Sequence, residues 1–170
     1  MAIDLVMPCE TYWKSYVDSY GEMNHDGLVD GMDWDGKSSA KKYFERAKEL
    51  SRGENLGDLV AATNFWIIAN NDYVGRMSIR HELNEWLRNY GGHIGYEIKK
   101  SARKKGYATK ALKLALIYCK TSLSLNEVLL TCDDDNIASI KTIEKNNGTL
   151  SYKNFDQIHK RMSRFYKIEL

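Results

Sequence analysis

The sequence contains little cysteine, little proline and no long hydrophobic run. Its 170 residues include three cysteines and one proline. An odd number of cysteines, with no Cys-x-x-Cys pair and no Cys/His ligand spacing, argues against a disulfide framework and against a zinc site. No apolar stretch approaches the roughly 20 residues of a membrane-spanning helix, and the N-terminus lacks the basic-then-apolar pattern of a secretory signal. We therefore expect free thiols, no metal, no membrane association and a cytoplasmic location.

The charge balance is close to neutral. The chain has 25 Lys and Arg residues against 23 Asp and Glu residues, a formal net charge of +2. This small excess does not support nucleic-acid binding over the whole surface. Hydrophobic residues make up 43% of the chain and charged residues 28%, as in ordinary globular proteins. Because no internal repeat, low-complexity segment or linker is present, the sequence predicts a single domain over residues 1–170.

The most informative stretch combines a strand at 93–99, a basic loop and a helix at 106–120. Five of the seven residues from Lys99 to Lys105 are Lys or Arg, and Gly106 stands where the loop becomes the helix. A glycine at such a junction lets backbone N–H groups approach a ligand closely, and a helix N-terminus favours negative charge. The stretch therefore predicts a binding site for a phosphorylated ligand.

Two motifs resemble those of the GNAT superfamily of N-acetyltransferases. Arg103-x-x-Gly106-x-Ala108 is similar to the family's (Gln/Arg)-x-x-Gly-x-(Gly/Ala) signature. Asn136-x-x-Ser139 is similar to its Asn-x-x-(Ala/Ser) segment. Each motif opens a helix that follows an apolar strand, in the order the family has. The resemblance implies that this chain binds acetyl-coenzyme A.

Hydrophobic periodicity predicts the element order β-α-α-β-β-β-α-β-α-β-β, which is also the GNAT order. The expected strands are 3–7, 64–69, 73–80, 93–99, 127–132, 150–153 and 162–169, and the expected helices begin near 9 and 38–39 and span 106–120 and 136–146. This order predicts an α/β (α+β) fold with a mixed, mainly antiparallel sheet and helices on both faces. The crossover helix makes 93–99 parallel to 127–132. The resemblance implies that these two strands splay apart and admit the pantetheine arm.

The resemblance also implies which residues hold the coenzyme. Backbone groups of Tyr96, Glu97 and Ile98 should pair with the pantetheine as an added strand would, with the Ile98 N–H as an oxyanion donor. The pyrophosphate should lie on the loop and the first helical turn, formed by Arg103, Lys104, Lys105, Gly106, Tyr107, Ala108 and Thr109. Asn136 and Ser139 are expected to contact the coenzyme as well. The alternative for this pair is a purely capping role, because both residue types favour helix N-termini.

Amine acetylation also needs a general base and a way to protonate the leaving thiolate. The candidate bases are His93 and Glu97, which a period of two places on one face of their strand. A structural hydrogen-bonding role is the alternative for each. Many family members use a tyrosine seven residues after the helix-opening asparagine as the acid, and this chain has Ile143 there. Tyr152, Tyr166 or water is then left for that role.

The predicted function is transfer of an acetyl group from acetyl-coenzyme A to a primary amine by direct attack in a ternary complex, an acyltransferase of class EC 2.3.1. The acceptor is a small-molecule or peptide amine, and a homodimer is left open. Two alternatives are a catalytically silent acyl-coenzyme A sensor and a nucleotide- or nucleic-acid-binding module. The second lacks both Gly-x-x-x-x-Gly-Lys-(Ser/Thr) and a broad basic face.

The connection at 21–37 suggests a cationic acceptor. It carries acidic residues and lies next to aromatic ones: Glu22, Asp26, Asp30, Asp33 and Asp35, with Tyr16, Tyr20 and Trp34. Carboxylates and aromatic faces attract a cationic amine. The alternative is that the aspartates and glycines only form turns.

Overall fold

The structure is a computed structural model that describes residues 2–23, 31–32, 34 and 36–170. Its strands are β1 (Ile3–Val6), β2 (Ala62–Ala69), β3 (Asp72–Arg80), β4 (Ile94–Ile98), β5 (Glu127–Asp133), β6 (Thr149–Asp156) and β7 (Arg161–Glu169). Its α-helices are α1 (Glu10–Ser19), α2 (Ala40–Arg52), α3 (Tyr107–Ser122) and α4 (Ile137–Glu144). Short turns of 3-10 helix cover Tyr20–Glu22 and Lys100–Ala102, and a π-helical turn covers Leu87–Gly91. The element order is the one that the sequence predicts.

Local signals explain where several elements begin and end. The side chain of Ser39 accepts the backbone N–H of Lys42 and so caps α2 at its N-terminus. The turn between β2 and β3 consists of Asn70 and Asn71, whose φ angles of 51° and 63° suit a tight hairpin. Asparagine tolerates this left-handed conformation better than most residues, so the hairpin forms where the sequence places it.

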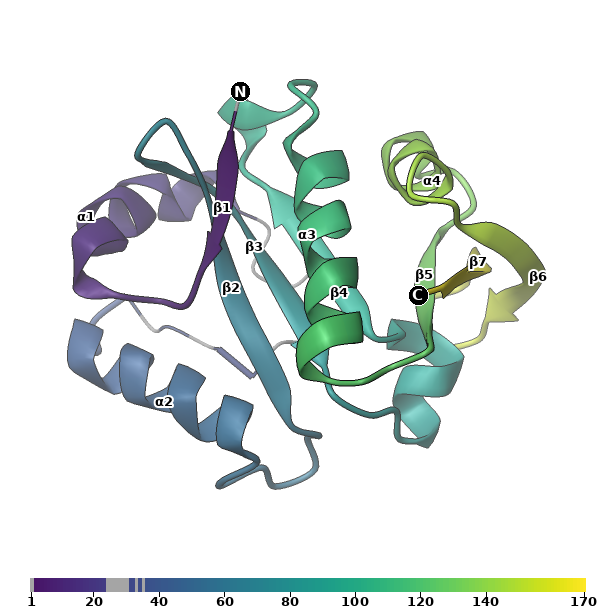
Figure 1. The fold of residues 1–170 in the computed structure, drawn as a ribbon, viewed down its shortest axis with the longest axis horizontal. Coiled ribbons are helices and arrows are strands. Elements are labelled where there is room, and N and C mark those ends of the chain that lie inside the picture. Colours follow the sequence, from purple (N-terminus) through teal and green to yellow (C-terminus); the bar gives the residue numbers. More distant parts are fainter. Residues whose placement is uncertain (1, 24–30, 33, 35) are drawn as a thin grey trace.

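The first sheet has the order β1-β2-β3-β4 with every pairing antiparallel. Figure 1 shows α1 and α2 on one side of this sheet and α3 on the other. Side chains of β2 alternate between the two sides, because successive residues of a strand point to opposite faces. Ile67 belongs to the core under α3, whereas Trp66 and Ile68 belong to the core under α1 and α2. The prediction of helices on both faces is confirmed.

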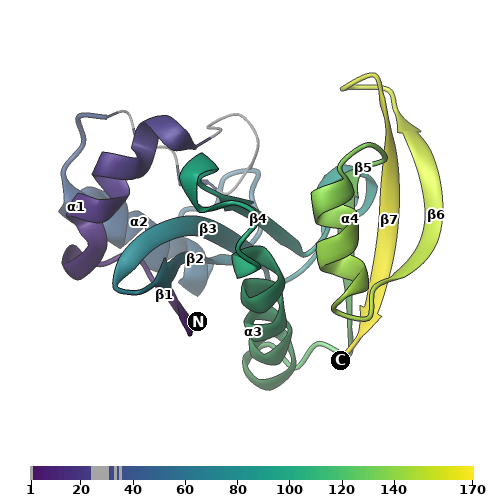
Figure 2. The same ribbon diagram turned by 90° about the horizontal axis from the view of Figure 1, so that it is seen from above.

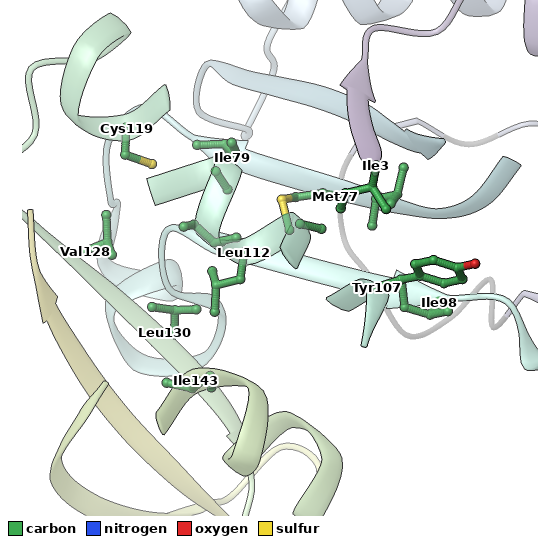
Figure 3. Close-up of a cluster of buried hydrophobic side chains, with 14 of the residues drawn as sticks. Ile3, Met77, Ile79, Ile98, Tyr107, Leu112, Cys119, Val128, Leu130 and Ile143 are labelled. Carbon is green, nitrogen blue, oxygen red and sulfur yellow. The ribbon is translucent and has the colours of Figure 1, made fainter. Parts of the chain in front are cut away.

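The two cores differ in the types of side chain that fill them. The core under α3 is mostly aliphatic, and Met77, Ile79 and Leu112 lie within it (Figure 3). The core under α1 and α2 is aromatic: Tyr16 stacks on Trp66 with ring centroids 4.9 Å apart. Tyr16 is only 4% exposed. This tyrosine is therefore a core residue and not part of a wall open to an acceptor.

The second sheet has the order β5-β7-β6 and is also antiparallel. It stands beside the first sheet, with α4 on the side that faces α3 (Figure 2). The side-chain amide of Asn146 donates to the carbonyl of Thr109 at 3.1 Å and so ties the end of α4 to α3. The molecule thus has two sheets that are held together by helices.

The two sheets touch at the beginning of β4 and then separate. The contact is an isolated bridge between Gly92 and Leu130. Gly92 has a φ of 65°, and a Cβ there would lie 2.5 Å from the carbonyl oxygen of Leu129, so only glycine fits. Among the described residues β4 and β5 form no ladder. The two strands splay apart, as the resemblance implies, and their parallel direction stays a prediction.

Three expectations from composition concern sites and membranes. Cys9, Cys119 and Cys132 are free thiols, as predicted. In the described ranges no helix is long and apolar enough to cross a membrane. The same residues contain no group of three His, Cys, Asp or Glu side chains placed to hold a metal ion.

Candidate active site between the two sheets

The phosphate-binding prediction rests on the N-terminus of α3. Gly106 is the N-cap residue, with a left-handed φ of 78°, and no side chain caps the first helical turn. A Cβ built on Gly106 would meet no atom within 4 Å, so the space beside it is open. An N-terminus without a side-chain cap presents backbone N–H groups and a positive dipole end. This arrangement fits a pyrophosphate approaching over Gly106.

The basic residues of the loop are placed in different ways. Lys104 and Lys105 are exposed beside Gly106. Arg103 turns back instead, and its Nε donates to the carbonyl of Ile98 at 3.0 Å. Glu22 accepts the backbone N–H of Ser101 at 2.8 Å, and hydrogen bonding to the Ser101 side chain, followed by this backbone bond, lowers the pKa of the Glu22 carboxyl. Arg103 therefore fixes the loop to the end of β4, and the lysines supply the open positive charge.

The backbone edge of β4 shows which residues can pair with a pantetheine. The Lys99 N–H donates to Val74 at 2.9 Å, and the His93 carbonyl accepts from Arg80 at 2.8 Å. Because hydrogen-bonding direction alternates along a strand, Glu97 also turns its backbone toward β3. Tyr96 and Ile98 turn theirs toward the gap between the sheets. Of the three expected backbone contacts, the geometry offers those of Tyr96 and Ile98, whereas the Glu97 backbone is used by the sheet.

A cleft with a volume of about 430 Å³ lies where the sheets diverge. Its walls come from both sheets and from the start of α4. On the side of the first sheet the cleft is lined by Trp86, Tyr90, Gly95 and Tyr96. On the side of the second sheet it is lined by Cys132, Asn136, Ser139, Asp156, His159 and Arg161. Burial raises the pKa of the Cys132 thiol to about 11. That thiol is therefore neutral at physiological pH.

The start of α4 places Asn136 and Ser139 in this cleft. The Asn136 side chain accepts the Ser139 N–H at 3.0 Å, so the capping role is real for Asn136. Ser139 also lies beside the Tyr96 phenol, together with Thr142. The phenol oxygen is buried without completing a hydrogen bond of good geometry to the described residues. Burial raises the pKa of Tyr96 to about 12, which keeps its hydroxyl protonated.

Ile143, which stands where many family members have a catalytic tyrosine, lies in the hydrophobic core. Ile143 is 1% exposed and packs in the aliphatic core. Neither tyrosine named as a substitute reaches the cleft. Tyr166 is fully buried and donates to Glu144, and Tyr152 stacks on Phe165 at a centroid distance of 4.4 Å. Two other tyrosines line the cleft, Tyr90 and Tyr96, and sequence analysis named Tyr96 only for its backbone.

His93 occupies the point where the sheets separate. Its backbone N–H donates to the Leu129 carbonyl at 2.7 Å, and its ring Nδ1 accepts the Leu129 N–H at 2.9 Å. The ring thus takes the place of a backbone acceptor as β4 moves away from β5. Burial, followed by Arg88 and Arg80, lowers the pKa of His93 to about 4. With Nδ1 accepting, the neutral ring carries its proton on Nε2 and has no lone pair left for an amine.

Glu97 has its side-chain contact on β3, whereas the His93 ring contacts β5. That the two residues share one face of the strand stays a prediction. The Glu97 carboxylate lies 3.3 Å from the Arg76 guanidinium on the neighbouring strand, and both side chains are largely buried. The pair stands on the sheet face that α1 and α2 cover. The contact gives Glu97 a structural hydrogen-bonding partner and leaves its catalytic role a prediction.

The turn between β6 and β7 supplies a histidine that sequence analysis missed. Nδ1 of His159 lies 2.6 Å from a carboxylate oxygen of Asp156, and both residues line the cleft. Arg161 pairs with Asp133 at 3.0 Å on the same wall. The spacing Asp-x-x-His was visible in the sequence, but only the fold brings this turn to the cleft that Tyr96 and Ser139 also line.

The acidic connection that suggested a cationic acceptor is only partly described. Asp26, Asp30, Asp33 and Asp35 lie outside the described residues. Of its aromatic neighbours, Trp34 accepts a hydrogen bond from the Tyr20 hydroxyl through its carbonyl at 2.6 Å. The hypothesis of a cationic acceptor therefore stays a prediction.

Comparison with known proteins agrees with this geometry. A family model described as an acetyltransferase (GNAT) domain matches residues 23–149. A curated relative from Bacillus subtilis (strain 168), the uncharacterized N-acetyltransferase YjdG, is 22% identical over 144 residues, covering 84% of this chain and 86% of that protein.

Two solved structures show the same fold at low sequence identity. RimL, a ribosomal L7/L12 alpha-N-protein acetyltransferase in complex with coenzyme A, is 17% identical with a TM-score of 0.69, covering all of this chain and 95% of that one. The microcin C7 self-immunity acetyltransferase MccE, in complex with acetyl-coenzyme A and AMP, is 18% identical with a TM-score of 0.68, covering 99% and 92%. Since the family model spans most of the sequence and the splayed sheets agree with it, the chain belongs to the GNAT acetyltransferases.

Proposed function

We propose that residues 1–170 act as a single domain that transfers the acetyl group of acetyl-coenzyme A to a primary amine. One observation carries this proposal: the chain leads from β4 to a helix N-terminus without a side-chain cap, and a polar cleft lies beside the same strand. A long thioester with a pyrophosphate at one end needs both features. The complexes named for RimL and MccE support the use of coenzyme A by this fold.

The coenzyme would be held mainly by backbone groups. Its pyrophosphate would lie on the first turn of α3 at Gly106 to Thr109, with Lys104 and Lys105 adding screened attraction. Its pantetheine would extend along β4 and pair with Tyr96 and Ile98. Asn136 and Ser139 would border the thioester end, because they line the cleft at the start of α4.

The reaction would be direct attack in a ternary complex. The neutral amine nitrogen attacks the thioester carbonyl carbon, the carbon–sulfur bond breaks, and coenzyme A leaves as a thiolate. The proton lost by the nitrogen passes to a base, and the thiolate gains a proton. Backbone N–H groups of Tyr96 and Ile98 on the open edge would stabilise the oxyanion.

His159 is our candidate for the base. Asp156 fixes its ring through Nδ1, which leaves Nε2 for the amine, and the side chain of His159 is 44% exposed within the cleft. A base held by a carboxylate is a recurrent catalytic arrangement. Glu97 is the second candidate, and it would have to release Arg76 to act. Tyr96 would donate a hydrogen bond to the leaving thiolate in place of the tyrosine that Ile143 replaces.

A silent acyl-coenzyme A sensor is the alternative function, and Ile143 is the observation in its favour. The two can be separated by giving the purified protein acetyl-coenzyme A with a panel of primary amines and measuring free thiol and acetylated product. Acetylation of an amine above the rate without protein supports the enzyme. Tight coenzyme binding without product formation across the panel would support the sensor function instead.

A further inference from the structure

We propose that a second cavity beside the cleft binds the acceptor, and that it selects a primary amine carrying an apolar group and a neighbouring hydrogen-bonding group. This inference rests on the proposed function, because it names the substrate class of the same site. The amine could belong to a free arylalkylamine or to the N-terminal residue of a peptide, which share this chemistry.

The cavity has a volume of about 300 Å³ and lies between β2, β3 and α2. Its walls are mostly aliphatic or aromatic: Leu50, Leu59, Val60, Ala62, Trp86 and Leu87. Asp58 also borders it but is exposed, so its carboxylate is in water. A second ammonium group pushed among the apolar walls would lose its hydration without a partner. The cavity therefore favours an apolar group over a polycation.

This cavity and the catalytic cleft are neighbours that share residues. Arg80 and Trp86 line both of them. An acceptor can therefore place its amine in the cleft and its apolar group in the cavity. A volume of about 300 Å³ is at the lower end for ligand pockets, so it suits a single side group and not a polymer segment.

Ser78 supplies the polar feature of the cavity. It borders the cavity and is fully buried, and its hydroxyl has no hydrogen-bond partner in the described part of the chain. Buried hydroxyls are normally paired, and an exception needs an explanation. Ser78 is the register partner of Gly95, which lines the cleft. A hydrogen-bonding group next to the acceptor amine would reach Ser78 at this place.

The test uses four probe amines that vary two features independently. Ethylamine has neither feature, glycinamide has the carbonyl, phenethylamine has the aromatic group, and phenylalaninamide has both. We expect the kcat/KM for phenylalaninamide to exceed that for glycinamide by at least about tenfold, the scale on which apolar pockets discriminate. Tripeptides beginning with Phe or Ser then distinguish the peptide source from the free amine.

Variants connect the preference to the cavity. We call the ratio of kcat/KM for phenylalaninamide to that for glycinamide the aromatic advantage. Ala62→Leu fills the cavity and should reduce this ratio to about threefold or less. Ala61→Leu, outside the cavity, should leave the ratio unchanged. Ser78→Ala should reduce the advantage of phenylalaninamide over phenethylamine and preserve that of phenylalaninamide over glycinamide. Should Ala62→Leu not fold, Trp86→Ala offers a second test, because Trp86 is 40% exposed.

Two outcomes would overturn the inference: an aromatic advantage below about threefold in the parent, or one that Ala62→Leu and Trp86→Ala both leave unchanged. Calorimetry of phenylalaninamide binding to the coenzyme A complex separates this failure from failure of the proposed function. Binding that depends on Ala62 without turnover of any amine would contradict the proposed function and support the acceptor cavity. Turnover of amines without any aromatic preference would support the proposed function and contradict the acceptor cavity.

Discussion

In the turn between β6 and β7, Nδ1 of His159 lies 2.6 Å from Oδ2 of Asp156, and Oδ1 of the same carboxylate accepts the backbone N–H groups of Ile158 and His159. Burial alone would raise the pKa of Asp156, but these hydrogen bonds outweigh it and lower the pKa. The carboxylate is thus ionised and fixed. Asp156 therefore sets the orientation of the His159 ring.

We predict that His159→Ala lowers kcat/KM by about 10²-fold, a typical contribution of a general base. Asp156→Asn should lower it less, because an asparagine still borders the ring but no longer holds Nδ1 with an ionised acceptor. Coenzyme affinity should stay unchanged in both. Lys160→Ala, an exposed neighbour in the same turn, is the matched control. Near-parent rates for His159→Ala at every pH would exclude this histidine as the base.

We predict that Tyr96→Phe separates catalysis from stability. The phenol has no well-formed hydrogen bond, so its removal should leave the free energy of unfolding unchanged or slightly higher. If the hydroxyl stabilises the leaving thiolate, kcat should fall about 10²-fold, the lower end of the range for proton-transfer groups. Tyr152→Phe, on exposed β6, is the control. An unchanged kcat would assign the thiolate proton to water.

We predict that Gly106→Glu weakens acetyl-coenzyme A binding by at least tenfold, about 1.4 kcal/mol. The carboxylate would fill the open space over the helix N-terminus and repel the pyrophosphate. The left-handed φ of 78° adds strain to any substitution. Gly57→Glu controls for this, because Gly57 also has a positive φ of 58° with open space around it, away from α3. Equal affinity in folded Gly106→Glu, measured by calorimetry, would remove the basis for the coenzyme site.

The sequence predicts the elements well where local signals decide. The hairpin at Asn70 and Asn71, the cap at Ser39 and the helix start at Gly106 all depend on residues adjacent in the chain. The element order follows from these signals and from hydrophobic periodicity, so the fold class is predictable as well. Alternation along β4 separates Tyr96 and Ile98 from Glu97, but only the pairing with β3 shows which of them face the gap.

The sequence does not predict features that depend on contacts between distant elements. The ring of His93 meets β5 because the two strands separate there, and no local pattern contains that information. The same holds for the Tyr96 phenol. It is a candidate donor to the thiolate only because the fold places α4 across from it. His159 reaches the cleft through the β6–β7 hairpin, whose position relative to β4 is a tertiary property. The catalytic predictions therefore differ more from the geometry than the coenzyme predictions do.

The last prediction concerns His93 as a structural residue with a pH-dependent contribution. Its pKa is lowered from the usual 6.5 to about 4, so the folded state favours the neutral ring that accepts the Leu129 N–H. Between these values the unfolded chain binds more protons, and stability must rise with pH there. Protonation of Nδ1 would break the contact at the point where the sheets separate.

We therefore expect the free energy of unfolding to fall by about 2 kcal/mol through His93 when the pH drops from 7 to 5. The measurement is urea unfolding at both pH values for the parent and for His93→Gln. The other histidines contribute equally in the two proteins, so the difference isolates this ring. His93→Gln should be less stable than the parent at pH 7 and should lose less stability at pH 5. If the two proteins lose the same amount, the ring does not accept the Leu129 amide in solution, and His93 becomes available again as a base.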